Sequence, residues 1–232
     1  MTQTPFLANA GYSDLRSASR REPGGFADRL GEISMFFRGN DPIHQTMRRI
    51  ALRFEQATIP YAIVGGMAVN AHRHRRTTGD VDFLLSAEGL AMLRRFVTAG
   101  EFDPTQGRPR RFVDRATGVS FDILVAGLFP GSGMPGPIAY PDPETVTQTI
   151  DDLRVVNLPT LIQLKLAAHR YQDFADVVSL IRANRLDEGF ADQLHPSVRG
   201  DYIECLEEMR REDDYEARQD QAFEDQPDQD AT

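Results

Sequence analysis

The chain has 232 residues, a formal net charge of −9, 41% hydrophobic residues and one cysteine, Cys205. A single cysteine excludes an internal disulfide and a cysteine-built metal site. No apolar run approaches the ~20 residues that cross a bilayer, and no secretory signal pattern is visible, so we expect a cytoplasmic protein with no membrane partner. The negative charge gathers in residues 201–232, which carry thirteen acidic and three basic residues. The remainder is close to neutral, so the overall acidity does not exclude a nucleic-acid partner.

The N-terminal part contains two predicted helices. Residues 1–40 are expected to be a loosely ordered segment with one helix over 26–37. Asp41 and Pro42 then provide a helix cap followed by proline at the first helical position. Apolar residues recur at helical spacing over 42–57, which predicts a helix that packs on a sheet.

Residues 61–85 read as a short strand (61–64), a glycine turn, a short helix, a basic loop (72–76) and a second strand (81–85). Gly65 and Gly66 lack a Cβ at the turn, so we expect a ligand to lie against bare backbone there. The free N–H groups of the following helix suit a phosphate.

Asp80 and Asp82 open the second of these strands. Strand alternation puts both side chains on one face, with Cα atoms about 6.5–7 Å apart. Two carboxylates this close do not both stay ionised cheaply without a cation between them. A phosphate cradle beside a carboxylate pair indicates metal-dependent phosphoryl chemistry.

The next segment contains a third carboxylate. Ser86 caps a predicted helix over 87–99, residues 104–110 are expected to be a loop, and 111–114 pairs with 119–125 as a hairpin. Asp122 lies among apolar residues in the second arm. A carboxylate on a buried strand is costly unless it is paired or binds a cation.

The C-terminal third is predicted to be mainly helical. After a Gly- and Pro-rich loop (127–145) and a second hairpin (146–150 with 153–156), a helix from Pro159 carries Lys165, the only lysine among 26 basic residues. Asp173 fits either a helix N-cap, with Asp176 at the third helical position, or a functional role. Helices continue to about residue 219, and 220–232 is expected to be a disordered acidic tail.

These motifs together resemble a known family. In order they are Gly65-Gly66, Arg76-x-Thr78-x-Asp80-x-Asp82, Asp122, and Lys165 followed by Arg170-x-x-Asp173-x-x-Asp176. The pattern resembles the polymerase-beta-type nucleotidyltransferase superfamily, and most closely its bacterial AbiEii-type toxin branch. The resemblance spans roughly residues 60–180. It implies transfer of a nucleoside monophosphate from a nucleoside triphosphate, with release of pyrophosphate.

The resemblance also implies roles for individual residues. Asp80, Asp82 and Asp122 are expected to hold two Mg²⁺ ions, with Mn²⁺ as a substitute, and Asp122 to draw the proton from the acceptor hydroxyl. Lys165 and Asp176 join them as catalytic residues, with Lys165 neutralising charge on the triphosphate. The predicted substrate-binding residues are Gly65, Gly66, Arg76 and Thr78.

The expected fold is α/β (α+β): a small mixed nucleotidyltransferase sheet flanked by helices (core 41–157), followed by a helical region (158–219). The acceptor stays open between tRNA or another RNA, a protein hydroxyl and a small antibiotic hydroxyl. The toxin branch implies an antitoxin partner. The alternative from a different class is a nucleotidyltransferase-like fold that has become a binding or antitoxin module.

Overall fold

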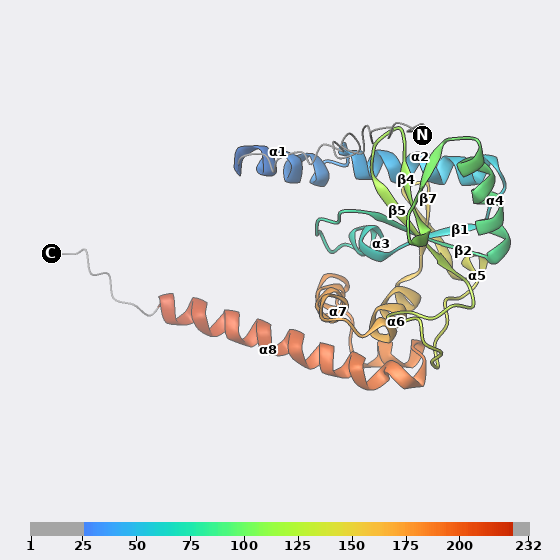
Figure 1. The fold of residues 1–232 in the computed structure, drawn as a ribbon. Helices are drawn as coiled ribbons and strands as arrows, with labels where there is room; N and C mark the ends of the chain where they lie inside the picture. The colour runs from blue at the N-terminus through green and yellow to red at the C-terminus, as the bar shows by residue number, and fades with distance from the viewer. Residues whose placement is uncertain (1–25, 225–232) are drawn as a thin grey trace, which may run out of the picture.

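The computed structural model describes residues 26–224 (Figure 1). Most of the predicted N-terminal segment and the end of the predicted acidic tail lie outside these residues. Within them, a mixed sheet is covered by helices on both faces, and further helices follow it. This arrangement confirms the predicted fold class.

The sheet has seven strands in the order β3-β4-β5-β2-β1-β7-β6. Their bounds are β1 Tyr61–Val64, β2 Val81–Leu85, β3 Phe102–Thr105, β4 Arg108–Asp114, β5 Ser120–Val125, β6 Thr147–Ile150 and β7 Leu153–Val156. β2 pairs in parallel with β5, and β1 in parallel with β7, whereas the other neighbours are antiparallel. The central strands β1 and β2 therefore carry neighbours on both sides.

The helices lie in layers around this sheet. They are α1 Phe26–Phe37, α2 Pro42–Gln56, α3 Gly65–Ala71, α4 Ala87–Thr98, α5 Pro143–Val146, α6 Leu158–Ala168, α7 Tyr171–Asn184 and α8 Arg199–Glu224, with 3-10 helices at Glu188–Gln193 and Pro196–Val198. α2 and α4 lie side by side on one face, where Arg53 stacks 4.5 Å from the centre of the Phe96 ring. α3, α6 and α7 lie on the opposite side of the sheet, with α8 outermost (Figure 1).

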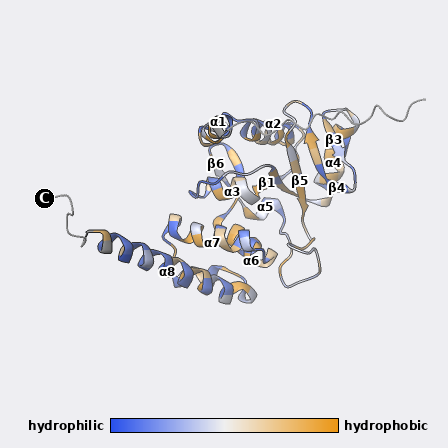
Figure 2. Ribbon diagram, turned by 60° about the vertical axis from the view of Figure 1, so that its left-hand side comes forward, coloured by the Kyte–Doolittle hydropathy of each residue, from blue (hydrophilic) through white to orange (hydrophobic). Residues whose placement is uncertain are grey.

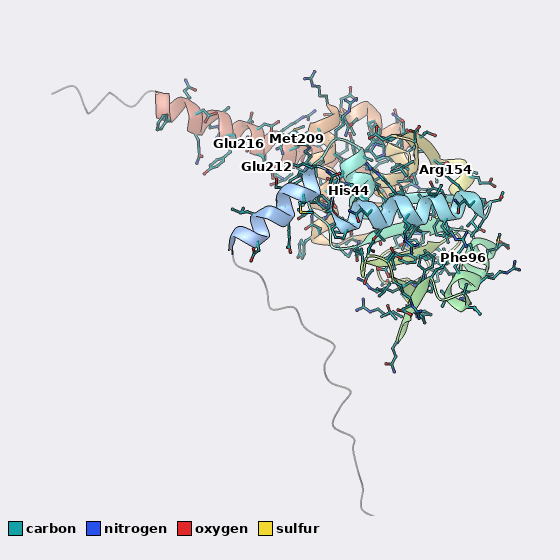
Figure 3. The ribbon with its side chains drawn as sticks, turned by 90° about the horizontal axis from the view of Figure 1, so that it is seen from above. His44, Phe96, Arg154, Met209, Glu212 and Glu216 are labelled. Carbon is teal, nitrogen blue, oxygen red and sulfur yellow. The ribbon has the colours of Figure 1, made fainter. Side chains whose placement is uncertain are left out.

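The sequence of α2 explains why it forms and where it packs. Asp41 Oδ1 accepts a hydrogen bond from the Ile43 backbone N–H at 2.8 Å, which satisfies one of the free donors at the helix start. The buried face presents Ile50 and Phe54 to the sheet, and the Phe54 ring lies 5.3 Å from that of Phe83 on β2. Figure 3 shows α2 from above, with His44 at its N-terminal end.

Helix α8 extends further than the sequence predicts. Tyr202, Cys205 and Leu206 anchor its first half in the core. Its second half is exposed, largely hydrophilic and runs out from the body (Figures 1 and 2), past the labelled Met209, Glu212 and Glu216 (Figure 3). Residues 220–224, expected to be disordered, continue this helix; hydrogen bonds such as that between Gln219 and Tyr215, one turn apart, support it. None of the helices within 26–224 has the length and apolar character that crossing a bilayer requires.

The predicted loop at 104–110 is wrong, because two strands meet there. Pro104 lies in β3, and Pro109 lies in β4. A proline is tolerated in a strand where its missing N–H is not needed for pairing. β3 is the edge of the sheet, and β5 pairs with β4 only from Arg111 to Val113, so neither proline interrupts a ladder on both sides.

Candidate active site

Three aspartates meet where β2 and β5 begin. The two strands are parallel with Asp82 opposite Asp122, and Asp80 immediately precedes β2. Parallel neighbours begin at the same edge of a sheet, so residues distant in sequence become adjacent. All three carboxylates line one open cavity of about 650 Å³. The fold thus brings together the three residues that the sequence predicts to converge.

These carboxylates carry negative charge that the protein compensates only in part. Burial, and then repulsion from Asp80 and Asp122, raises the pKa of Asp82 to about 7. Burial also raises the pKa of Asp122, against the opposing effect of Arg111. A divalent cation would lower both pKa values, and an all-oxygen donor set suits Mg²⁺. The donor chemistry therefore fits the predicted metal.

Arg111, on β4, is not among the residues predicted from the sequence. Its Nη1 donates to Asp122 Oδ2 at 2.6 Å and to Asp80 Oδ2 at 3.3 Å. As the side chains stand in residues 26–224, no three His, Cys, Asp or Glu residues form a metal-binding group. The available signal was the hairpin itself, since Arg111 lies directly opposite Asp122. Arg111 is therefore part of the carboxylate site.

The two glycines line the same cavity, but the predicted reason for them needs correction. Gly65 has a φ of +61°, and a Cβ there would lie 1.9 Å from Asp82 Oδ2. A Cβ on Gly66 would lie 2.8 Å from Thr78 Oγ1. The space left by the missing Cβ atoms is thus filled by the protein's own side chains. Both glycines serve the packing of Asp82 and Thr78 against the β1–α3 turn.

Across the cavity lies a cluster of charges around two buried carboxylates, here called the lysine cluster. Lys165 Nζ, on α6, contacts Asp176 Oδ2 at 2.6 Å and Asp173 Oδ1 at 3.2 Å. Asp176 also accepts from Arg76 Nη2 at 3.0 Å, and Asp173 accepts from Arg170 Nε at 2.6 Å. Three cations therefore surround two carboxylates, and the cluster carries a net positive charge.

Of the two alternatives for Asp173, a helix N-cap or a functional role, the N-cap is wrong. α7 begins at Tyr171, so both aspartates lie inside the helix, and both side chains bind Lys165 instead of free N–H groups. Asp173 lines the cavity together with Lys165 and Arg76. Asp176 is 1% exposed and lies behind them. Its position suits holding Lys165 and Arg76 in place more than contact with reacting atoms.

The basic loop 72–76 does not lie at the entrance as a unit. His72 is buried, and its Nε2 lies 2.8 Å from the backbone oxygen of Val156. Arg75 turns away, with its guanidinium 5.9 Å from the centre of the Phe37 ring on α1. Arg76 alone of these residues lines the cavity. The basic loop is therefore divided among three environments.

The Gly- and Pro-rich segment forms a wall of the cavity. Phe129, Tyr140 and residues 131–133 line it. Gly131 has a φ of +65°, and a Cβ there would lie 2.7 Å from the Ala168 backbone oxygen at the end of α6. Two lining residues, Arg110 and Arg170, are both charged and exposed. The exposed charge at the opening is therefore positive.

Comparisons with known proteins give distant structural likenesses. No protein-family model and no curated protein sequence matches the chain. ANT(2")-Ia in complex with adenylyl-2"-tobramycin shares 14% identity, with a TM-score of 0.46, over 69% of this chain and 96% of that one. The lincomycin-bound lincosamide antibiotic adenylyltransferase LnuA shares 14% identity, with a TM-score of 0.41, over 59% of this chain and 94% of that one. JHP933 from Helicobacter pylori shares 15% identity, with a TM-score of 0.42, over 65% of this chain and 70% of that one. Such values are too low to assign a family or a function.

Proposed function

We propose that the protein is a metal-dependent nucleotidyltransferase of the polymerase-beta type. The observation that carries this proposal is one cavity with two opposite chemistries. Three aspartates lie on its sheet side, whereas Lys165, Arg76 and Arg170 lie on its other side. Carboxylates suit hard cations, and lysine and arginine side chains suit a triphosphate. Moving a nucleoside monophosphate between oxygens needs both.

The carboxylate side would hold the metal. Asp80, Asp82 and Asp122 would coordinate Mg²⁺, or Mn²⁺ in its place, and two ions are what the family resemblance implies. When bound, the metal supplies positive charge that stabilises the phosphoryl oxygens in the transition state. Burial, and repulsion among the aspartates, raises the pKa of Asp82 and Asp122, and a bound cation would stabilise the ionised form of both.

The remaining residues would bind, orient and move a proton. The acceptor hydroxyl oxygen forms a bond to the α-phosphorus, and the bond from that phosphorus to the pyrophosphate oxygen breaks. Asp122 would accept the hydroxyl proton as the general base. Lys165 would neutralise charge on the leaving pyrophosphate, held in place by Asp173 and Asp176. Gly65, Gly66 and Thr78 would shape the floor beside the phosphates.

The acceptor we propose is an RNA, with a tRNA end as the leading candidate. Arg110 and Arg170 make the opening positive, which attracts phosphate groups and repels a cationic small molecule. An RNA acceptor also agrees with the resemblance to AbiEii-type toxins. A toxin role with an antitoxin partner follows from the same resemblance. It predicts that induced expression arrests growth and that Asp82→Asn abolishes the arrest.

The test is to incubate the protein with Mg²⁺ and each α-labelled nucleoside triphosphate, together with total RNA, total protein or a panel of antibiotics. We expect label in RNA, lost with EDTA and with Asp82→Asn. The matched control is Asp103→Asn, since Asp103 is an exposed carboxylate on β3 paired with Arg115; it should label normally. Label in protein or in an antibiotic would show that the acceptor is of that class and not an RNA. No label in any fraction would favour a binding module and contradict the enzyme.

A further inference from the structure

One nitrogen atom of Arg111 contacts two carboxylates at once. Its Nη1 lies 2.6 Å from Asp122 Oδ2 and 3.3 Å from Asp80 Oδ2. The three side chains are 22–31% exposed, so water screens the contacts only in part. The guanidinium thus lies where a cation shared by Asp80 and Asp122 would lie. Within residues 26–224 these are the ion pairs recorded for either carboxylate.

Other basic groups act on the site from further away. Lys165 and Arg170 lower the pKa of Asp82, and Arg108 acts on Asp122, without an ion pair to the carboxylate in either case. Their own partners explain this, since Lys165 and Arg170 are already bound to aspartates of the lysine cluster. Arg111 is therefore the group best placed to compensate Asp80 and Asp122.

We propose that Arg111 is an exchangeable counterion of the carboxylate site, which competes with divalent metal for Asp80 and Asp122. This inference rests on the proposed function, because it takes these aspartates as metal ligands. A metal ion on the same Oδ2 atoms would lie close to the guanidinium, and their like charges repel each other at this distance. Metal binding therefore favours displacement of Arg111 from Oδ2 of both residues.

The displaced guanidinium stays in the cavity, because Arg111 lines it along with Gly65, Gly66 and Lys165. A nucleotide triphosphate in that cavity offers it a new partner, since a guanidinium binds phosphate in a bidentate manner. Nucleotide therefore favours the displaced position of Arg111 and, through it, the metal. By linkage, metal and nucleotide should each increase the affinity for the other.

An arginine suits this role for a chemical reason. Its guanidinium is more weakly hydrated than an ammonium and offers five N–H donors, so it gives up little when it leaves water for two carboxylates. The free site is thereby protected from the mutual repulsion of Asp80, Asp82 and Asp122 until metal arrives. The cost is weaker binding of free divalent cations in the absence of nucleotide.

The test is calorimetric titration of Mg²⁺ and Mn²⁺ into the full chain without nucleotide, for wild type, Arg111→Gln and Arg110→Gln. Arg110 is the neighbouring residue on β4, exposed, lines the same cavity and carries the same charge, but has no recorded ion pair with the carboxylates. We expect Arg111→Gln to bind metal at least about tenfold more tightly. Arg110→Gln should stay within about twofold of wild type. In EDTA, Arg111→Gln should melt at a lower temperature than wild type, and added metal should raise its Tm more.

A second titration repeats these measurements with a non-hydrolysable nucleoside triphosphate. We expect nucleotide to tighten metal binding in wild type, and to do so less in Arg111→Gln, because the competing guanidinium is already gone. If Arg111→Gln fails to fold, Arg111→Lys takes its place. Its shorter side chain carries a more strongly hydrated ammonium, so it should hold the two carboxylates less well, and metal binding should again be tighter than in wild type.

Three outcomes overturn the inference. Unchanged or weaker metal binding in the Arg111 variant would show that the guanidinium does not compete. An equal change in Arg110→Gln would show a general charge effect in place of a specific contact. An equal effect of nucleotide on metal affinity in wild type and Arg111→Gln would show that Arg111 does not link nucleotide binding to metal binding. Failure of the proposed function looks different: wild type itself would then bind no divalent metal, with or without nucleotide.

Discussion

Replacing Lys165 with methionine tests whether the lysine cluster is as buried in solution as its geometry indicates. The change keeps the length and most of the volume of the side chain and removes one positive charge. Lys165 is 7% exposed and contacts Asp173 and Asp176, whose side chains are 4% and 1% exposed. Without the ammonium, two buried carboxylates lose a shared partner and cannot be hydrated in its place.

The expected loss in the free energy of unfolding depends on the ion pairs that remain. Removing one partner of a buried ion pair typically costs about 3–5 kcal/mol. Arg76 still pairs with Asp176, and Arg170 still pairs with Asp173, so we expect the lower end, about 3 kcal/mol. For a protein of this size that corresponds to a fall in Tm of roughly 6–12 °C. Adding Asp173→Asn to the variant should restore part of the loss, because it removes one uncompensated charge.

Urea unfolding at pH 7 measures the effect directly as a change in the free energy of unfolding. The matched control is Arg182→Met. Arg182 also bridges two carboxylates, Glu212 at 2.7 Å and Asp213 at 2.8 Å, but all three side chains are 40–49% exposed. Exposed pairs contribute about 0–1 kcal/mol, so this control should lose little. If Lys165→Met lost no more than Arg182→Met, the lysine cluster would not be buried as described, and its stabilising role would be refuted.

Three further predictions concern other parts of the site. Asp82→Ala should leave the protein folded, since it relieves repulsion among the aspartates, but lower nucleotide transfer by about a hundredfold or more in a labelled-triphosphate assay. Burial lowers the pKa of His72, so its contribution to stability is full above about pH 6.5 and falls as the pH drops through the folded pKa. The free energy of unfolding in urea should therefore differ less between pH 7.5 and pH 5.5 in His72→Gln than in wild type. Gly65→Ala should destabilise by at least about 1–2 kcal/mol, by thermal unfolding, whereas Gly79→Ala, with open space around it, should change stability by less than about 0.5 kcal/mol.

The central strands were predictable because their signals are local. β1 and β2 have the bounds expected from the sequence, since an apolar run ends at Gly65 in one case and begins after Asp80 in the other. The convergence of Asp80, Asp82 and Asp122 followed from the family resemblance, because nothing local specifies that β2 and β5 lie side by side. β3 was missed because Pro104 is a strong local signal against a strand, and only its place at the sheet edge removes the conflict.

The missed contacts share a different cause. Arg111 gains its importance from a partner strand, and Lys165 gains its two aspartates from a second helix. Each contact depends on how elements pack, which the residue types themselves do not reveal. The capping alternative for Asp173 shows the same limit: it places the first helical residue at 174, three residues after the actual start at Tyr171, so an aspartate inside the helix was compatible with a cap.

The two chemistries of the cavity come from different parts of the chain. The sheet provides the carboxylates, whereas Lys165, Arg170 and their aspartates belong to α6, α7 and the turn between them. Arg76, in the loop before β2, joins the two sides by pairing with Asp176 on α7. Since Asp176 also holds Lys165, a single carboxylate sets the position of a cation from each side. Asp176 therefore aligns the halves of the site although it does not itself face the cavity.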